Sequence, residues 1–157
     1  MNELNIYQLI GEIIENCQCI EHDLKIIYAI AKPGDFNYNL EDTKKWNLGE
    51  IIAKIEELDH RNIFPFDLDD KDYELLNSIR NERNFVCHEC FQSYEYIEDY
   101  HFKRVEYEKV VNRVANFHKI SKRLSQAIGT IRVAIVKEYR GCLLYTSDAA
   151  DEARSVD

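Results

Sequence analysis

The chain has 157 residues, 45% of them hydrophobic and 31% charged, with 29 acidic and 20 basic side chains and few Gly and Pro. This length suits one domain, and the apolar content is too high for a disordered or low-complexity chain. No run of 18 apolar residues occurs, and the first residues lack the basic and apolar pattern of a secretion signal. We therefore expect no membrane span and a cytoplasmic location.

Two helices are predicted in the first 60 residues. Apolar side chains recur at steps of three and four from Ile6 to Ala31, which is typical of one long amphipathic helix, expected from Asn2 to Ala31. Pro33-Gly34 should end it. A second, shorter helix is expected where Asn47 and Glu50 form a capping pair in front of another apolar stripe.

Two further helices are predicted in the rest of the chain. Asp69 or Asp70 can cap a third helix that runs to about Phe91. Residues 92–101 show no clear period, and from Phe102 the apolar stripe resumes in a long, basic fourth helix. The pattern predicts an all-α fold, most simply an antiparallel four-helix bundle with long first and last helices.

Charge is distributed unevenly along the chain. Residues 1–102 carry 9 basic and 22 acidic side chains, whereas residues 103–140 carry 10 basic and 3 acidic ones. A globally acidic protein binds nucleic acid poorly, so only the second segment could supply a basic surface. Two interpretations remain: the basic helix complements the acidic surface within the fold or a dimer, or it attracts RNA.

The C-terminal residues 142–157 form a separate segment. Their sequence from Cys142 to Glu152 resembles a conceptual translation of a transposase-type sequencing adapter. We therefore expect a helical domain at residues 1–141 followed by a non-native tail, the alternative being a genuine polar tail after a long helix.

The predicted third helix carries a cation where an apolar residue is expected. Arg83 falls in the middle of its apolar stripe, where a charge is costly unless it is paired or faces a partner or a cavity. Arg80, Asn84 and His88 share the adjacent ridge, so Asn84 is placed to hydrogen-bond His88 and fix its tautomer. The stripe itself consists of Leu76, Ile79, Val86 and Cys90.

A zinc site at the end of this helix is not expected. The run Cys87-His88-Glu89-Cys90 has suitable spacing, but no second pair of ligands exists elsewhere in the sequence to complete four. We predict no metal and no cofactor.

The run from Arg83 to His88 resembles the Arg-x4-His motif, commonly with Asn after the Arg, of the HEPN domain family. These helical bundles include many metal-independent endoribonucleases and toxin partners of minimal nucleotidyltransferases. The resemblance extends over nearly all of residues 1–140 through the long first helix, the second helix and the long last helix. Cys90 departs from the toxin branch, which often has Tyr there.

The resemblance implies an endoribonuclease, a toxin or defence protein, that leaves 2′,3′-cyclic phosphate ends. His88 would handle protons and Arg83 would stabilise charge on the phosphate, with Asn84, Arg80 and Glu89 in supporting positions. It also implies a homodimer, an RNA substrate and an antitoxin or nucleotidyltransferase partner. The alternative is a non-catalytic binding or regulatory module, as in mannitol-operon-repressor-like proteins with a similar Arg-Asn-x3-His sequence.

Overall fold

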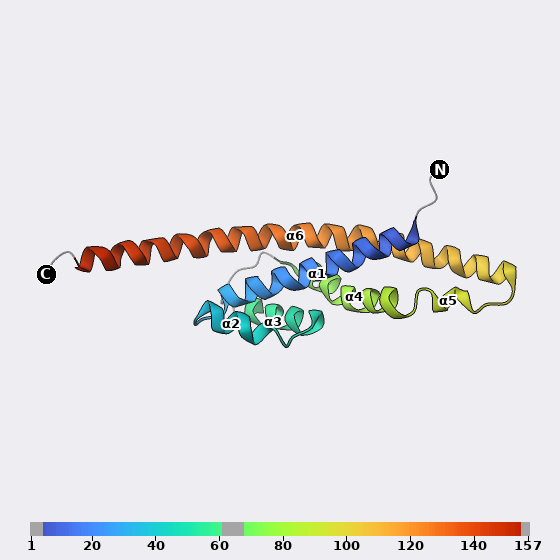
Figure 1. The fold of residues 1–157 in the computed structure, drawn as a ribbon, viewed down its shortest axis with the longest axis horizontal. Coiled ribbons are helices and arrows are strands. Elements are labelled where there is room, and N and C mark those ends of the chain that lie inside the picture. The colour runs from blue at the N-terminus through green and yellow to red at the C-terminus, as the bar shows by residue number, and fades with distance from the viewer. Residues whose placement is uncertain (1–4, 61–67, 155–157) are drawn as a thin grey trace.

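The computed structural model describes residues 5–60 and 68–154, with side chains described as far as Tyr139. This part of the chain contains helices and no strand, so the predicted all-α class is confirmed. Figure 1 shows the arrangement. The helices are α1 (Ile6–Ala31), α2 (Phe36–Thr43), α3 (Leu48–His60), α4 (Asp70–His88), α5 (Gln92–Glu95) and α6 (Tyr100–Arg154).

The predicted long first helix is α1. Its described part starts after Asn5, whose side chain accepts hydrogen bonds from the backbone N–H groups of Tyr7 and Gln8. The predicted start at Asn2 lies outside the described residues. One face of α1 joins the hydrophobic core through an apolar stripe spaced by three, four and seven residues, namely Ile6, Ile13, Cys17, Ile20, Leu24 and Ile27.

The short helix α2 was not predicted, because the residues it buries are the polar Asn39 and Thr43. The turn before it uses Gly34, whose φ of +120° is a conformation that favours glycine. The Asn39 side-chain amide then donates to the carbonyl oxygens of Ala29 and Lys32, at 3.3 and 2.9 Å. These bonds satisfy carbonyls at the end of α1 and hold α2 against it.

Both predicted capping arrangements of α3 and α4 are present. The Asn47 N–H donates to Glu50 Oε2 at 2.7 Å, and Asn47 Oδ1 accepts from the Glu50 N–H at 3.2 Å. At the start of α4, Asp69 and Asp72 form a reciprocal capping box. Helix α4 ends at His88, three residues before the predicted end.

Helices α1 and α6 run parallel, which differs from the predicted antiparallel bundle. Glu12 pairs with His118 at 2.6 Å and Asp23 with Arg132 at 2.7 Å, so residue numbers rise together along both helices (Figure 1). The difference arises because α2 adds a return segment. It carries the chain back along α1 to Leu48, which shares a pocket with the middle of α1.

The last helix, α6, has 55 residues and is about 80 Å long at the standard rise. It begins at Tyr100, close to the predicted Phe102, and its C-terminal part extends past the rest of the fold (Figure 1). The expected non-native tail at residues 142–157 lies outside the described side chains and stays a prediction. No described helix is both long and apolar enough to cross a membrane. The core face of α6 consists of Val110, Val114, Phe117, Leu124, Ile128 and Ile135.

Candidate functional site

Arg83 lies on the core-facing side of α4, as its place in the apolar stripe predicts. The surrounding stripe residues Leu76, Ile79, Val86 and Cys90 are all buried. Arg83 itself is half-buried, and its Nε atom is buried without a hydrogen-bond partner in the described part of the chain. The helix therefore holds a guanidinium group partly out of water without giving that nitrogen a partner.

This guanidinium lines a pocket of about 220 Å³ between α1, α3 and α4. Within the pocket, burial raises the pKa of Cys17 to about 11, although the positive charge of Arg83 acts in the opposite direction. The nearby Glu21 carboxylate pairs with Lys25 at 2.7 Å. The full lining is Ile14, Cys17, Gln18, Glu21, Leu48, Arg83 and Cys87.

His88 is the last residue of α4 and its side chain is exposed. The expected hydrogen bond from Asn84 is absent, and no other described residue hydrogen-bonds the His88 ring. The ring is exposed at a helix end, so water can hydrogen-bond to it, and no described contact holds it against Asn84. His88 and Arg83 are five residues apart, about 140° around the helix, and only Arg83 lines the pocket.

The expected supporting residues Arg80 and Glu89 flank the motif on the surface of α4 and at its C-cap. Arg80 lies across Gly49 of α3, where an added Cβ would be 3.0 Å from Arg80 Cδ. Glycine at this position therefore leaves room for the arginine. Glu89 is exposed, and its backbone N–H closes the end of α4 by donating to the Phe85 carbonyl oxygen at 2.9 Å.

A cluster beside the motif was missed by the sequence analysis. Arg113 of α6 makes two hydrogen bonds to Glu82 of α4, at 2.9 and 2.8 Å, and its guanidinium carbon is 3.6 Å from the centroid of the Phe85 ring. The hydrogen bond to Glu82 is the main reason that the pKa of Arg113 is raised. No local pattern predicts a pair 31 residues apart. The cluster fixes α4 to α6 next to Arg83.

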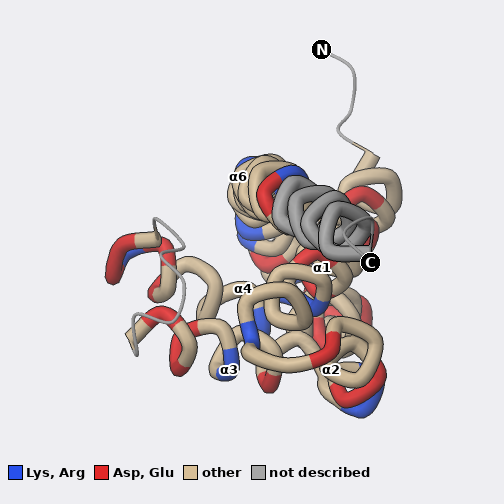
Figure 2. The backbone as a smooth tube through the Cα atoms, turned by 90° about the vertical axis from the view of Figure 1, so that its left-hand side faces the viewer, with Lys and Arg blue, Asp and Glu red and all other residues tan. Residues whose placement is uncertain are grey.

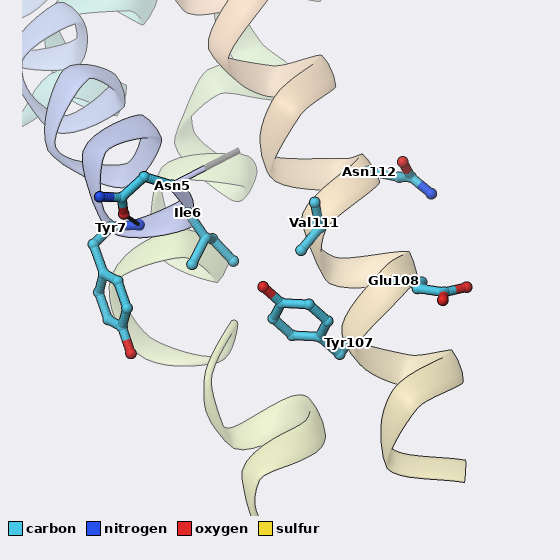
Figure 3. Close-up of a pocket in the computed structure, with 7 residues that line it drawn as sticks. All are labelled: Asn5, Ile6, Tyr7, Tyr107, Glu108, Val111 and Asn112. Carbon is cyan, nitrogen blue, oxygen red and sulfur yellow. Dashed lines mark hydrogen bonds between the residues drawn. The ribbon is translucent and has the colours of Figure 1, made fainter. Parts of the chain in front are cut away.

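A larger cavity, of about 780 Å³, lies away from the motif, between the first turn of α1 and the N-terminal part of α6 (Figure 3). Its polar groups come from two amide side chains, two phenols and one carboxylate, with no basic side chain. That set does not suit a phosphate, since no cation is present to neutralise it. Its lining is Asn5, Ile6, Tyr7, Tyr107, Glu108, Val111 and Asn112.

Within the described residues, no group of three or more His, Cys, Asp or Glu side chains is arranged to hold a metal ion. Comparison of the chain with protein-family models, curated proteins and solved structures finds no match.

Proposed function

We propose that this chain is a metal-independent endoribonuclease of the HEPN type. The observation that supports the proposal is the uncommitted positive charge on α4. None of Arg80, Arg83 and His88 has a carboxylate oxygen within 4.0 Å among the described residues, whereas other cations of the fold, such as Arg113 and Arg132, are paired. Unpaired cations at one helix end are suited to a phosphodiester.

The chemistry requires a proton acceptor and a cation at one phosphate. The ribose 2′-oxygen attacks the adjacent phosphorus, its proton passes to a base, and the 5′-oxygen leaves with a proton as the 2′,3′-cyclic phosphate forms. An imidazole with an ordinary pKa near ~6.5 can exchange protons at neutral pH. In this proposal His88 transfers protons and the planar fork of Arg83 binds the phosphate oxygens.

A second copy of the chain would complete this site. Arg83 and His88 of one chain point to different sides of α4, so a single copy does not present both groups to one phosphate. Two-fold pairing through the α4 face would place groups from both copies around one phosphodiester. In this arrangement α1, α3, α4 and α6 are the four HEPN-like helices, and α2 and α5 are additions to them.

A non-catalytic binding or regulatory module is the second candidate. It is favoured by the exposed His88 ring, which no described residue orients by a hydrogen bond. Under this alternative the motif residues stabilise the bundle or hold a partner. The antitoxin or nucleotidyltransferase partner implied by the resemblance is compatible with either function.

The test is cleavage of a labelled single-stranded RNA in the presence of EDTA. We expect fragments that end in 2′,3′-cyclic phosphate, and His88→Ala should lower the rate by ~10²-fold or more. His60→Ala is the matched control, because the His60 ring lies 6.4 Å from Tyr73 in the first turn of α4, at the opposite end from His88. Circular dichroism should show both variants folded.

Light scattering at micromolar concentration should give the mass of two chains. Folded wild-type protein that cuts no RNA, or a His88→Ala variant as active as wild type, would leave the binding module as the function. A monomeric mass together with full activity would contradict the two-copy arrangement of the site but not the ribonuclease function.

A further inference from the structure

One long stretch of α6 carries only positive charge. Between Glu108 and Glu138 the helix has no acidic residue. Such a run along a single helix is either neutralised by the rest of the fold or presented to a partner. The basic residues in this stretch are Lys109, Arg113, Lys119, Lys122, Arg123, Arg132 and Lys137.

The fold neutralises only part of this charge. Lys109 pairs with Glu106 on the same helix, while Arg113 and Arg132 pair with carboxylates of α4 and α1. For the remaining four basic side chains, no described carboxylate oxygen comes within 4.0 Å. We call these four the outer stripe: Lys119, Lys122, Arg123 and Lys137.

The outer stripe faces away from the core. Lys119 is nine residues from both Val110 and Ile128, which is two and a half turns, so it points opposite to these two buried side chains. Lys137 follows Lys119 by five full turns, about 27 Å along the axis. Lys122 is also exposed, about 60° around the helix from Lys119, and its charge contributes to the lowered pKa of Glu12 on α1.

Apart from Glu12 and Asp23 of α1, which pair with His118 and Arg132, much of the acidic charge lies on another side of the molecule. Figure 2 shows α6 at one side of the molecule, with α2 and α3, where acidic segments are frequent, at the opposite side. Interactions between exposed charges are largely screened beyond a Debye length of about 8 Å at physiological salt. The negative charge of the α2–α3 side therefore acts only weakly at the outer stripe.

The surroundings of the outer stripe favour a polyanion over a protein partner. Stable protein interfaces have an apolar core, and aromatic side chains and Met are enriched there. Between Lys119 and Lys137 the described chain has one exposed large hydrophobic residue, Val133, and no aromatic residue or Met. Exposed hydrogen-bonding side chains flank the stripe instead, namely Asn112, Asn116, Gln126 and Thr130.

We propose that the outer stripe binds the phosphate backbone of single-stranded RNA. A row of cations on one helix face matches the regular charge of an extended backbone, and binding would be independent of sequence because no base is read. This inference rests on the proposed ribonuclease function, for which it supplies a substrate-binding surface separate from Arg83 and His88.

Binding is measured with a fluorescent 2′-O-methyl RNA, which lacks the attacking hydroxyl and stays intact with the wild-type protein. Replacing Lys119, Lys122 and Arg123 together by Ala should weaken binding at least ~10-fold at low salt. The slope of log affinity against log salt should decrease by about 2, since each phosphate contact on a single strand contributes ~0.7.

The matched control replaces Lys44, Lys45 and Lys54 by Ala. It changes the net charge equally, but these lysines lie on the α2–α3 side and pair with neighbouring carboxylates. Its affinity should stay within about twofold of wild type, because only contacts with phosphate release counterions. Equal weakening of both variants would show that only net charge matters and would overturn the inference.

Other outcomes separate this inference from the proposed function. Wild-type protein that binds no RNA at low salt, or a stripe variant that binds like wild type, overturns it. A stripe variant with unchanged RNA affinity but a changed mass in light scattering would assign the stripe to a second copy of the chain. If the protein binds RNA through the stripe but does not cleave unmodified RNA, the binding surface is supported and the ribonuclease function is contradicted.

Discussion

Replacing Arg113 by Ala should destabilise the fold more than the loss of an ordinary surface cation. The Arg113–Glu82 pair is partly exposed, with side-chain exposures of 47% and 27%. We therefore assign its two hydrogen bonds no more than about 1 kcal/mol. Stacking of the guanidinium on the Phe85 ring adds about 0.5–1 kcal/mol. The expected loss of unfolding free energy is therefore about 0.5–2 kcal/mol, which lowers the melting temperature by up to about 8 °C.

Urea unfolding followed by circular dichroism measures this loss. Arg113→Lys keeps the charge but loses the planar fork and most of the stacking, so it should show about half the effect. A double-mutant cycle with Glu82→Gln should give a coupling free energy of ~0.5–1 kcal/mol. Lys54→Ala, which breaks an exposed pair within α3, should change stability by less than ~0.5 kcal/mol.

The same measurements can show that the cluster does not hold the two helices together. If Arg113→Ala stays within ~0.5 kcal/mol of wild type, or if the cycle with Glu82→Gln shows no coupling, the cluster does not fix α4 to α6. The position of Arg83 would then depend on the α1 and α3 contacts of the pocket alone.

Three further predictions concern other parts of the chain. Hydrogen bonds from Gln8 and His118 lower the pKa of Glu12, so its contribution to stability is present above pH 4.5 and lost as the pH falls through the lowered pKa. Glu12→Gln should therefore give a shallower acid limb in urea unfolding from pH 3 to 7, and parallel profiles would contradict this. Gly49→Ala should raise helix stability by up to ~1 kcal/mol but displace the Arg80 side chain. RNA cleavage should then fall without a lower melting temperature, and unchanged cleavage would show that Arg80 is not part of the site. Deleting residues 142–157 should change the unfolding free energy by less than ~0.5 kcal/mol, and a larger loss in thermal unfolding would show that the tail is structural.

The sequence predicted the helices that bury an apolar stripe. Apolar residues recur at spacings of three and four residues in each of the helices α1, α3, α4 and α6. The caps at Asn47 and Asp69 follow from local hydrogen bonding. Helix α2 was missed because Asn39 and Thr43, which it buries, are polar and break the pattern. Missing this one segment also gave the wrong relative direction of α1 and α6.

The candidate site was predictable only where it depends on helical periodicity. The place of Arg83 in a buried stripe follows from residue spacing, and the structure places its Nε out of water. The prediction of an Asn84–His88 hydrogen bond was wrong. Residue spacing shows that two side chains are neighbours on a helix, but it does not show that packing holds them together. The Glu82–Arg113 pair depends on how α4 and α6 meet in space, which no local pattern contains.

The acidic character of the chain is consistent with RNA binding once the pairing of charges is considered. Most cations outside α4 and the outer stripe are paired with carboxylates, so they add little attraction for phosphate. Unpaired carboxylates elsewhere repel a polyanion, and like charges brought together disfavour binding in that orientation. Among the described residues, an RNA strand would therefore meet unpaired cations mainly on α4 and along the outer stripe. If the proposed function holds, the excess of negative charge would direct the strand toward Arg83 and His88 instead of opposing its binding.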